Sequence, residues 1–120
     1  MKRIIILGAG TAGTMMANHL HHHLNSNDWE IDILDERTEH YYQPGYLFLP
    51  FDIYTPDDII KPIKDFIPRG VNLIHEQIER IMPEEQYISM TNGDRLHYEI
   101  LIIATGAKIA PDETEGMLGP

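Results

Sequence analysis

Three glycines near the start of the chain have the spacing of a nucleotide-phosphate site. Gly8, Gly10 and Gly13 form a G-x-G-x-x-G pattern that follows an apolar run and opens a helix-forming segment. In this pattern the first glycine permits a tight turn, the second lets the backbone approach a pyrophosphate, and the third lets the helix pack on the strand. We expect the backbone N–H groups of Gly10, Thr11, Ala12 and Gly13, together with the helix dipole, to bind the anion.

An acidic residue follows at the place where such a site needs one. Asp35 lies 22 residues after Gly13, and its carboxylate is predicted to accept hydrogen bonds from the ribose hydroxyls, with Glu36 as the alternative. Two carboxylates would repel a 2′-phosphate, which favours FAD or NAD over NADP, although Arg37 leaves NADP open. The glycines and the acid do not separate FAD from NAD, because both cofactors present the same adenosine and pyrophosphate.

The elements that must position these residues form a βαβ unit over residues 3–35. Residues 3–7 are a continuous apolar run, typical of a strand buried on both faces of a parallel sheet. An apolar stripe at helical spacing extends from Thr11 to Leu24, and residues 29–34 read as a second strand. The sequence therefore predicts a doubly wound, Rossmann-like α/β fold.

The rest of the chain is predicted to be a long loop, a meander and a closing strand. Prolines at 44, 50, 56, 62 and 68 make residues 36–70 a proline-rich loop, with a short helix starting at Pro56 and a strand at 71–75. Residues 77–98 alternate as an antiparallel meander, in which Asn92-Gly93 predicts a type I′ hairpin turn. Residues 100–104 are the expected fourth parallel strand, beside the first.

Composition limits the possible functions. The chain has 120 residues, enough for one domain, and its net charge of −10 argues against nucleic acid as a partner. It contains no cysteine, so a disulfide, a thiolate metal site and a cysteine nucleophile are excluded within it. The apolar run that starts at Ile4 is too short for a signal peptide, and we expect a cytoplasmic protein.

Two segments carry a resemblance to a known family. Residues 98–106, YEILIIATG, closely resemble the strand and Ala-Thr-Gly turn shared by flavoproteins with two dinucleotide-binding domains. Residues 40–51, HYYQPGYLFLPF, look like the stretch after the second strand in sulfide:quinone oxidoreductases, of the pyridine nucleotide-disulfide oxidoreductase superfamily. Type II NADH:quinone oxidoreductases and flavocytochrome c sulfide dehydrogenases carry looser versions of this stretch.

The resemblance implies FAD as the cofactor and assigns residues to its parts. The three glycines would hold the pyrophosphate, Asp35 or Glu36 the ribose, and the backbone of Ile78 the adenine. Further residues would lie beside the cofactor or near its flavin end: Gln43, Pro44, Ala104, Thr105 and Gly106.

The resemblance also implies an activity for a longer protein. Electrons would pass from sulfide to FAD and then to quinone, with a cysteine disulfide beside the flavin. Because these 120 residues hold no cysteine, we expect a truncated amino-terminal part of an FAD-binding domain, inactive alone, with the cysteines beyond Pro120. We assign no catalytic residue here. The alternatives are a type II NADH:quinone oxidoreductase and a non-catalytic nucleotide-binding module.

The cellular location and the assembly of such a protein follow from the same interpretation. Missing regions would give peripheral membrane association, with the inner face of the membrane as an alternative to a purely cytoplasmic location. Exposed apolar sheet edges predict self-association of the chain. Residues 46–51 are apolar enough for a membrane or quinone contact, but internal packing over the cofactor is the favoured interpretation.

The histidines are not assigned to a site. His19 and His23 share a helix face at the four-residue spacing of metal ligands, but catalytic zinc sites use three protein ligands, so no metal is predicted. His40 and His75 are expected to be hydrogen-bonded rather than catalytic.

Overall fold

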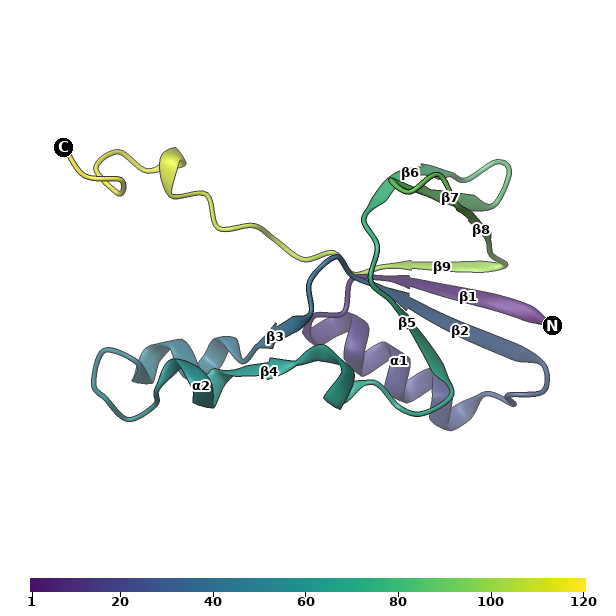
Figure 1. The fold of residues 1–120 in the computed structure, drawn as a ribbon, viewed down its shortest axis with the longest axis horizontal. Helices are drawn as coiled ribbons and strands as arrows, with labels where there is room; N and C mark the ends of the chain where they lie inside the picture. The colour runs from purple at the N-terminus through teal and green to yellow at the C-terminus, as the bar shows by residue number, and fades with distance from the viewer.

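A four-stranded parallel sheet forms the centre of the molecule in the computed structural model, which describes residues 1–120. Its strands are β1 (Lys2–Leu7), β2 (Trp29–Leu34), β5 (Val71–Ile74) and β9 (Ile100–Ile103), in the order β5-β2-β1-β9. Helix α1 (Thr11–His23) connects β1 to β2. All four strands are parallel, so their carboxyl ends meet at one edge of the sheet, where the tail of the chain leaves it (Figure 1).

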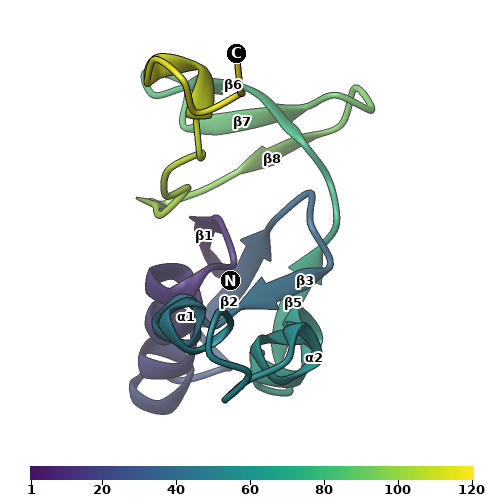
Figure 2. The same cartoon turned by 90° about the vertical axis from the view of Figure 1, so that its left-hand side faces the viewer.

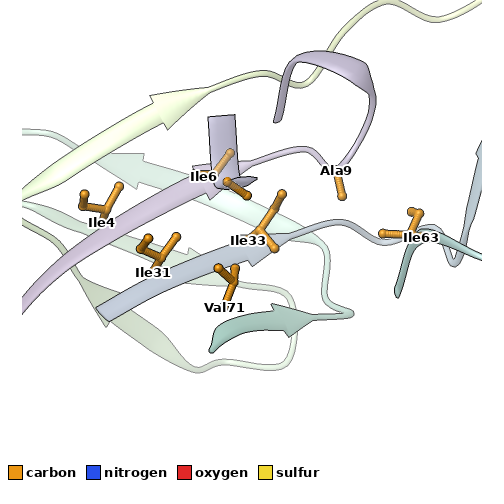
Figure 3. Packing of buried hydrophobic residues seen from close by; sticks show 8 residues of the cluster. Ile4, Ile6, Ala9, Ile31, Ile33, Ile63 and Val71 are labelled. Atoms are coloured by element: carbon orange, nitrogen blue, oxygen red, sulfur yellow. The ribbon is translucent and has the colours of Figure 1, made fainter. Parts of the chain in front are cut away.

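The apolar runs of the central strands are buried on both faces of the sheet. Ile4 and Ile6 pack with Ile31 and Ile33 on the face that α1 covers (Figure 3). Ile5 points to the opposite face, in the cluster that also holds Ile88 and Met90. Continuous rather than alternating hydrophobicity in β1 therefore has a direct cause, since water reaches neither side of the strand.

The antiparallel meander covers that second face. It consists of β6 (Ile78–Met82), β7 (Tyr87–Met90) and β8 (Arg95–His97) in sequential order. Figure 2 shows α1 and the meander on opposite sides of the parallel sheet. The predicted α/β class, with a Rossmann-like parallel sheet and an inserted meander, is confirmed.

The turn between β7 and β8 differs from the prediction of a type I′ turn. A type I′ turn needs a positive φ at both central residues, but of the predicted pair only Gly93 has one, at 92°. The hydrogen bonds also differ from those of a two-residue turn. Met90 N donates to Asp94 O and Gly93 N donates to Met90 O, so three residues, 91–93, form the loop. The Asn92 side chain accepts a hydrogen bond from Asp94 N at 2.9 Å and so holds the wider loop.

Residues 36–70 are more regular than the predicted proline-rich loop. The expected short helix is present as α2 (Pro56–Ile59). In addition, β3 (Glu39–Tyr41) pairs antiparallel with β4 (Ile60–Pro62), flanked by the 3₁₀ helices η1 (Gln43–Phe48) and η2 (Ile63–Phe66). We call residues 39–62 the ribbon. It projects from the sheet beyond α1 (Figure 1).

A polar cluster interrupts the apolar sheet. Asp32, which is only 2% exposed, accepts a hydrogen bond from Asn72 Nδ2 at 2.7 Å. Arg3 Nε lies 3.2 Å from Asp32 Oδ2, within ion-pair distance but not oriented for a hydrogen bond, and Arg3 Nη2 donates to Glu30 at 3.0 Å. Burial raises the pKa of Asp32, and the bond from Asn72 and the charge of Arg3 only partly offset that effect.

None of the helices combines the length and the apolar character that crossing a membrane requires.

The tail after β9 contains a single 3₁₀ turn, η3 (Pro111–Glu113).

Candidate functional site

A cleft of about 720 Å³ opens at the carboxyl edge of the parallel sheet. This is the edge at which ligands bind in open α/β folds. Its walls come from the loop after β1, the end of β2, the end of β5, the start of the ribbon and the tail after β9. The cleft brings together these predicted site residues: Gly8, Asp35, Glu36, Gln43, Ile78, Thr105 and Gly106.

A second, smaller cavity of about 50 Å³ adjoins the glycine loop. Gly10 and Thr11 line it, and Asp35 and Gln43 line both this cavity and the cleft. On its other side Tyr41 donates a hydrogen bond to Glu39 at 3.1 Å, and this bond raises the pKa of Tyr41. Of the residues predicted for the pyrophosphate and the ribose, those that line one or both of these cavities are Gly8, Gly10, Thr11, Asp35 and Glu36.

Two glycines of the loop are required by the packing of the protein itself. Gly8 has a φ of 97°, and a Cβ there would lie 2.3 Å from the carbonyl oxygen of Ala104. A Cβ on Gly13 would lie 1.8 Å from the carbonyl oxygen of Gly8. Neither position can carry a side chain unless the backbone shifts, because the loop, the helix and the end of β9 are in close contact.

Gly10 is different, because nothing in the protein demands a glycine there. A Cβ on Gly10 would have no neighbour within 4 Å, and its φ of −78° is accessible to any residue. Gly10 is the N-cap of α1, with no side-chain cap and no acidic residue in the first helical turn. The space above Gly10 and the free N–H groups at the start of α1 fit an anion that approaches the backbone closely.

Asp35 is buried and holds the loop as well as facing the cleft. Its Oδ2 accepts a hydrogen bond from Ala9 N at 2.9 Å, and its Oδ1 accepts one from Arg37 N at 2.9 Å. A carboxylate oxygen has two acceptor sites, so each oxygen retains one for a ribose hydroxyl. The bond to Ala9 was not predicted, since spacing along the sequence does not show that the second strand ends beside the glycine loop.

Some predicted site residues line neither cavity. Ala12 and Gly13 lie within α1, Pro44 is the second residue of η1, and Ala104 directly follows β9. Ala104 N donates to Leu7 O at 2.8 Å, which fixes the end of β9 beside the loop.

Other residues line the cleft without having been predicted: Leu34, Arg37, Glu76, Gln77, Ala107, Lys108 and Ile109. Glu76 and Gln77 directly precede the predicted Ile78, so the end of β5 was a usable signal for them. Lys108 and Ile109 come from the tail, where no periodic pattern marked them. Both line the cleft and follow Gly106, which has a φ of 69°.

The histidines of α1 form no complete metal site. The rings of His19 and His23 lie with their centroids 4.3 Å apart, and no group of three or more potential ligand residues gathers there or elsewhere in the chain.

Comparison with protein families gives one match over nearly the whole chain. The pyridine nucleotide-disulphide oxidoreductase family matches residues 2–119. Mitochondrial sulfide:quinone oxidoreductase of Dictyostelium discoideum is 30% identical over 117 residues, which are 98% of this chain and 26% of that protein. A type II NADH:quinone oxidoreductase of Staphylococcus haemolyticus is 26% identical over 119 residues, which are 98% of this chain and 29% of that protein.

Solved structures show the same fold. Sulfide:quinone oxidoreductase of Aquifex aeolicus superposes with a TM-score of 0.77 at 24% identity, over 92% of this chain and 25% of that one. A Plasmodium falciparum structure described as NDH2 in complex with NADH superposes with a TM-score of 0.72 at 22% identity, over 96% of this chain and 24% of that one.

The chain thus spans about a quarter of the length of the relatives it matches. The superpositions cover nearly the whole chain, so its overall fold is that of these solved structures. With a family match over residues 2–119, the chain belongs to the pyridine nucleotide-disulphide oxidoreductase family.

Proposed function

We propose that this chain is the amino-terminal part of an FAD-binding domain and holds the adenosine and pyrophosphate of FAD. The observation that carries the proposal is Gly10. It lines the smaller cavity, and a Cβ there would have no neighbour within 4 Å, so the protein itself needs no glycine at this position. The buried carboxylate of Asp35 stands beside it, between that cavity and the cleft.

Each part of the cofactor has a counterpart among these residues. The N–H groups of residues 10–13 bind the pyrophosphate. Asp35 accepts hydrogen bonds from the ribose hydroxyls, with Glu36 at the cleft wall as the alternative acceptor. The backbone of Ile78 meets the adenine. The predicted neighbours of the flavin end are Gln43, Pro44, Ala104, Thr105 and Gly106.

When bound, FAD supplies a redox-active flavin ring that takes up and releases electrons. The residues of this chain bind and orient it. Since the sequence has no cysteine, any disulfide chemistry of the whole protein belongs to residues outside it.

For the whole protein we propose the activity of a sulfide:quinone oxidoreductase, with electrons passing from sulfide to FAD to quinone. The similarity to the Dictyostelium discoideum protein, the solved fold of the Aquifex aeolicus protein and the segment at residues 40–51 support this choice. A type II NADH:quinone oxidoreductase is the second candidate, supported by similarity of comparable extent to the Staphylococcus haemolyticus protein.

The location and assembly of the protein are further proposals. We propose that the protein works in the cytoplasm, at the inner face of the membrane, with membrane contact through regions outside this chain. We also propose that the chain self-associates through its exposed apolar side chains.

Titration with FAD tests the cofactor assignment. The purified chain is mixed with FAD and separated from free cofactor, and the visible absorption of the protein fraction is measured. Asp35→Asn should retain at least tenfold less FAD than the unaltered chain, because it removes the charged acceptor of the ribose hydrogen bonds. Glu84→Gln is the matched control and should retain FAD, since that side chain is exposed, lines neither cavity and makes no hydrogen bond within the protein.

The electron donor is tested on the full-length protein that contains this chain. Bleaching of the flavin absorption by sulfide without NADH supports the first candidate. Bleaching by NADH alone supports the second.

A further inference from the structure

Arg37 occupies a position that the function proposed above does not yet use. It lines both the cleft and the smaller cavity beside the glycine loop, and it is the only arginine or lysine of that smaller cavity. Gly10 and Thr11, whose N–H groups face an incoming anion, line the same cavity. The side chain of Arg37 therefore has access to the space where we place the pyrophosphate.

The charge around the site makes a cation there important. Asp35, Glu36 and Glu76 line the cleft, Glu39 lines the smaller cavity, and the chain as a whole carries a net charge of −10. A pyrophosphate diester brings two more negative charges, and the glycine loop offers only backbone N–H groups to meet them. Without a nearby cation, the surrounding carboxylates would repel the ligand.

The present contact of the Arg37 side chain is weak enough to be exchanged. Its Nε lies 3.5 Å from Asp35 Oδ1, and its side chain is 58% exposed. The backbone N–H of Arg37, by contrast, donates to the same oxygen at 2.9 Å. The guanidinium can leave the carboxylate while the backbone bond keeps the chain in place, because an exposed ion pair of this kind contributes little to stability.

We propose that Arg37 is a binding residue for the pyrophosphate, held beside Asp35 in the free protein and moved onto the phosphates when the dinucleotide enters. This inference rests on the proposed dinucleotide site.

The competing role for Arg37 is recognition of a 2′-phosphate, as in NADP-binding sites. The geometry favours the pyrophosphate, since Arg37 shares the smaller cavity with Gly10 and Thr11. Asp35 and Glu36, in addition, would repel a 2′-phosphate.

Three ligands separate these roles: ADP, which carries a pyrophosphate, adenosine, which carries no phosphate, and 2′-AMP. Their dissociation constants are measured by NMR chemical-shift titration of the full chain, for the unaltered protein and for Arg37→Gln. Arg69→Gln is the matched control, because it makes the same charge change at an exposed residue just before β5, at the opposite edge of the sheet.

We expect Arg37→Gln to weaken ADP binding roughly tenfold or more, the usual effect of losing a hydrogen bond to a charged group. Adenosine binding should change less than about twofold, and the loss for ADP should shrink at high salt, where the charge is screened. Arg69→Gln should leave all three constants unchanged.

Equal losses for adenosine and ADP would overturn the proposal, as would a loss confined to 2′-AMP or an equal effect of Arg69→Gln. If the unaltered chain binds neither adenosine nor ADP, the proposed dinucleotide site itself fails, and the role of Arg37 fails with it. Binding of adenosine with an Arg37-independent ADP constant rejects the role of Arg37 alone.

Discussion

At the scale of single residues, Gly10 and Gly13 are glycines for different reasons, and alanine at each should reveal which. Gly13→Ala places a Cβ 1.8 Å from a backbone oxygen, so we expect it to lower the free energy of unfolding by about 1–3 kcal/mol. Gly10→Ala meets no atom within 4 Å, so the free energy of unfolding should change by less than about 1 kcal/mol. Urea unfolding measures both values.

Gly10→Ala should nevertheless weaken nucleotide binding. Because the added methyl group of Gly10→Ala occupies the space above the helix terminus, ADP binding should fall at least tenfold in a protein that remains folded. Normal ADP binding by a folded Gly10→Ala variant would show that no phosphate approaches this backbone.

Asp32 is buried in the sheet and should make stability depend on pH. Because burial raises its pKa above the ordinary value of 3.8, the folded chain binds its proton more strongly than the unfolded chain does. The stability that this proton contributes is present below pH 3.8 and is lost as the pH rises through the higher folded-state pKa.

Asp32→Asn tests this dependence, because it cannot ionise. We expect the free energy of unfolding of the variant, minus that of the unaltered chain, to increase as the pH rises above about 4. Urea unfolding at a series of pH values measures the difference, in which other titrating groups largely cancel. A difference that stays constant or falls with pH would contradict the assignment.

At the scale of elements, α2 depends on its own first turn. Asp58 Oδ2 accepts hydrogen bonds from Thr55 N at 2.7 Å and from Thr55 Oγ1 at 3.0 Å, and these bonds lower the pKa of Asp58. The lowered pKa means that the contribution of Asp58 is present at neutral pH and is lost as the pH falls through the acidic range.

Asp58→Asn should therefore loosen the ribbon at neutral pH. The bond from Tyr42 N to Ile59 O, 2.8 Å long, joins the end of α2 to the opposite side of the ribbon, so the Tyr42 amide reports its opening. We expect faster hydrogen exchange there in Asp58→Asn. The carboxylate of Asp57 makes no hydrogen bond within the protein, so Asp57→Asn should leave the exchange rate unchanged. Equal acceleration by both variants would show that the hydrogen bonds of Asp58 do not stabilise the ribbon.

The elements also show which parts of the fold a sequence can predict. Strand β1 was predictable because burial on both faces leaves an unbroken apolar run, and α1 was predictable because its apolar residues recur at helical spacing. The pairing of β3 with β4 in the ribbon was not predicted, because each of these strands has three residues and one of them ends at Pro62, which masks any alternation. The prediction of a type I′ turn at Asn92 was wrong because the hydrogen bond from Asp94 N to the Asn92 side chain stabilises a longer loop.

The candidate site was predictable in the same unequal way. Its glycines and Asp35 stand at fixed distances along a βαβ unit, so spacing was sufficient for them. Lys108 lines the cleft only because the tail after β9 passes the sheet edge, a tertiary arrangement that local patterns do not encode.

At the scale of the whole molecule, the chain is extended for its length. Its radius of gyration is 17.0 Å, compared with about 14 Å for a compact domain of this size. The ribbon and the tail project in different directions from the sheet (Figure 1). Both carry exposed apolar side chains, among them Leu47, Phe51 and Ile53 on the ribbon and Ile109 and Leu118 on the tail.

Self-association should bury the ribbon in preference to the other exposed apolar positions. Leu47 and Phe51 are 73% and 74% exposed, in contrast to the internal packing predicted for residues 46–51. The rings of Phe48 and Tyr54 have centroids 5.3 Å apart. Covering such a surface is favourable by about 25 cal/mol for each Å² removed from water. We therefore expect the chain to sediment as an oligomer, and the double variant Leu47→Glu with Phe51→Glu to sediment as a monomer.

A control with the same added charge is Met15→Glu with Leu118→Glu, which alters two similarly exposed apolar residues, on α1 and on the tail. It should keep the oligomer, because neither residue belongs to the ribbon. A monomeric unaltered chain at high concentration would reject self-association. Loss of the oligomer in the control as well would mean that charge repulsion, rather than burial of the ribbon, governs the assembly.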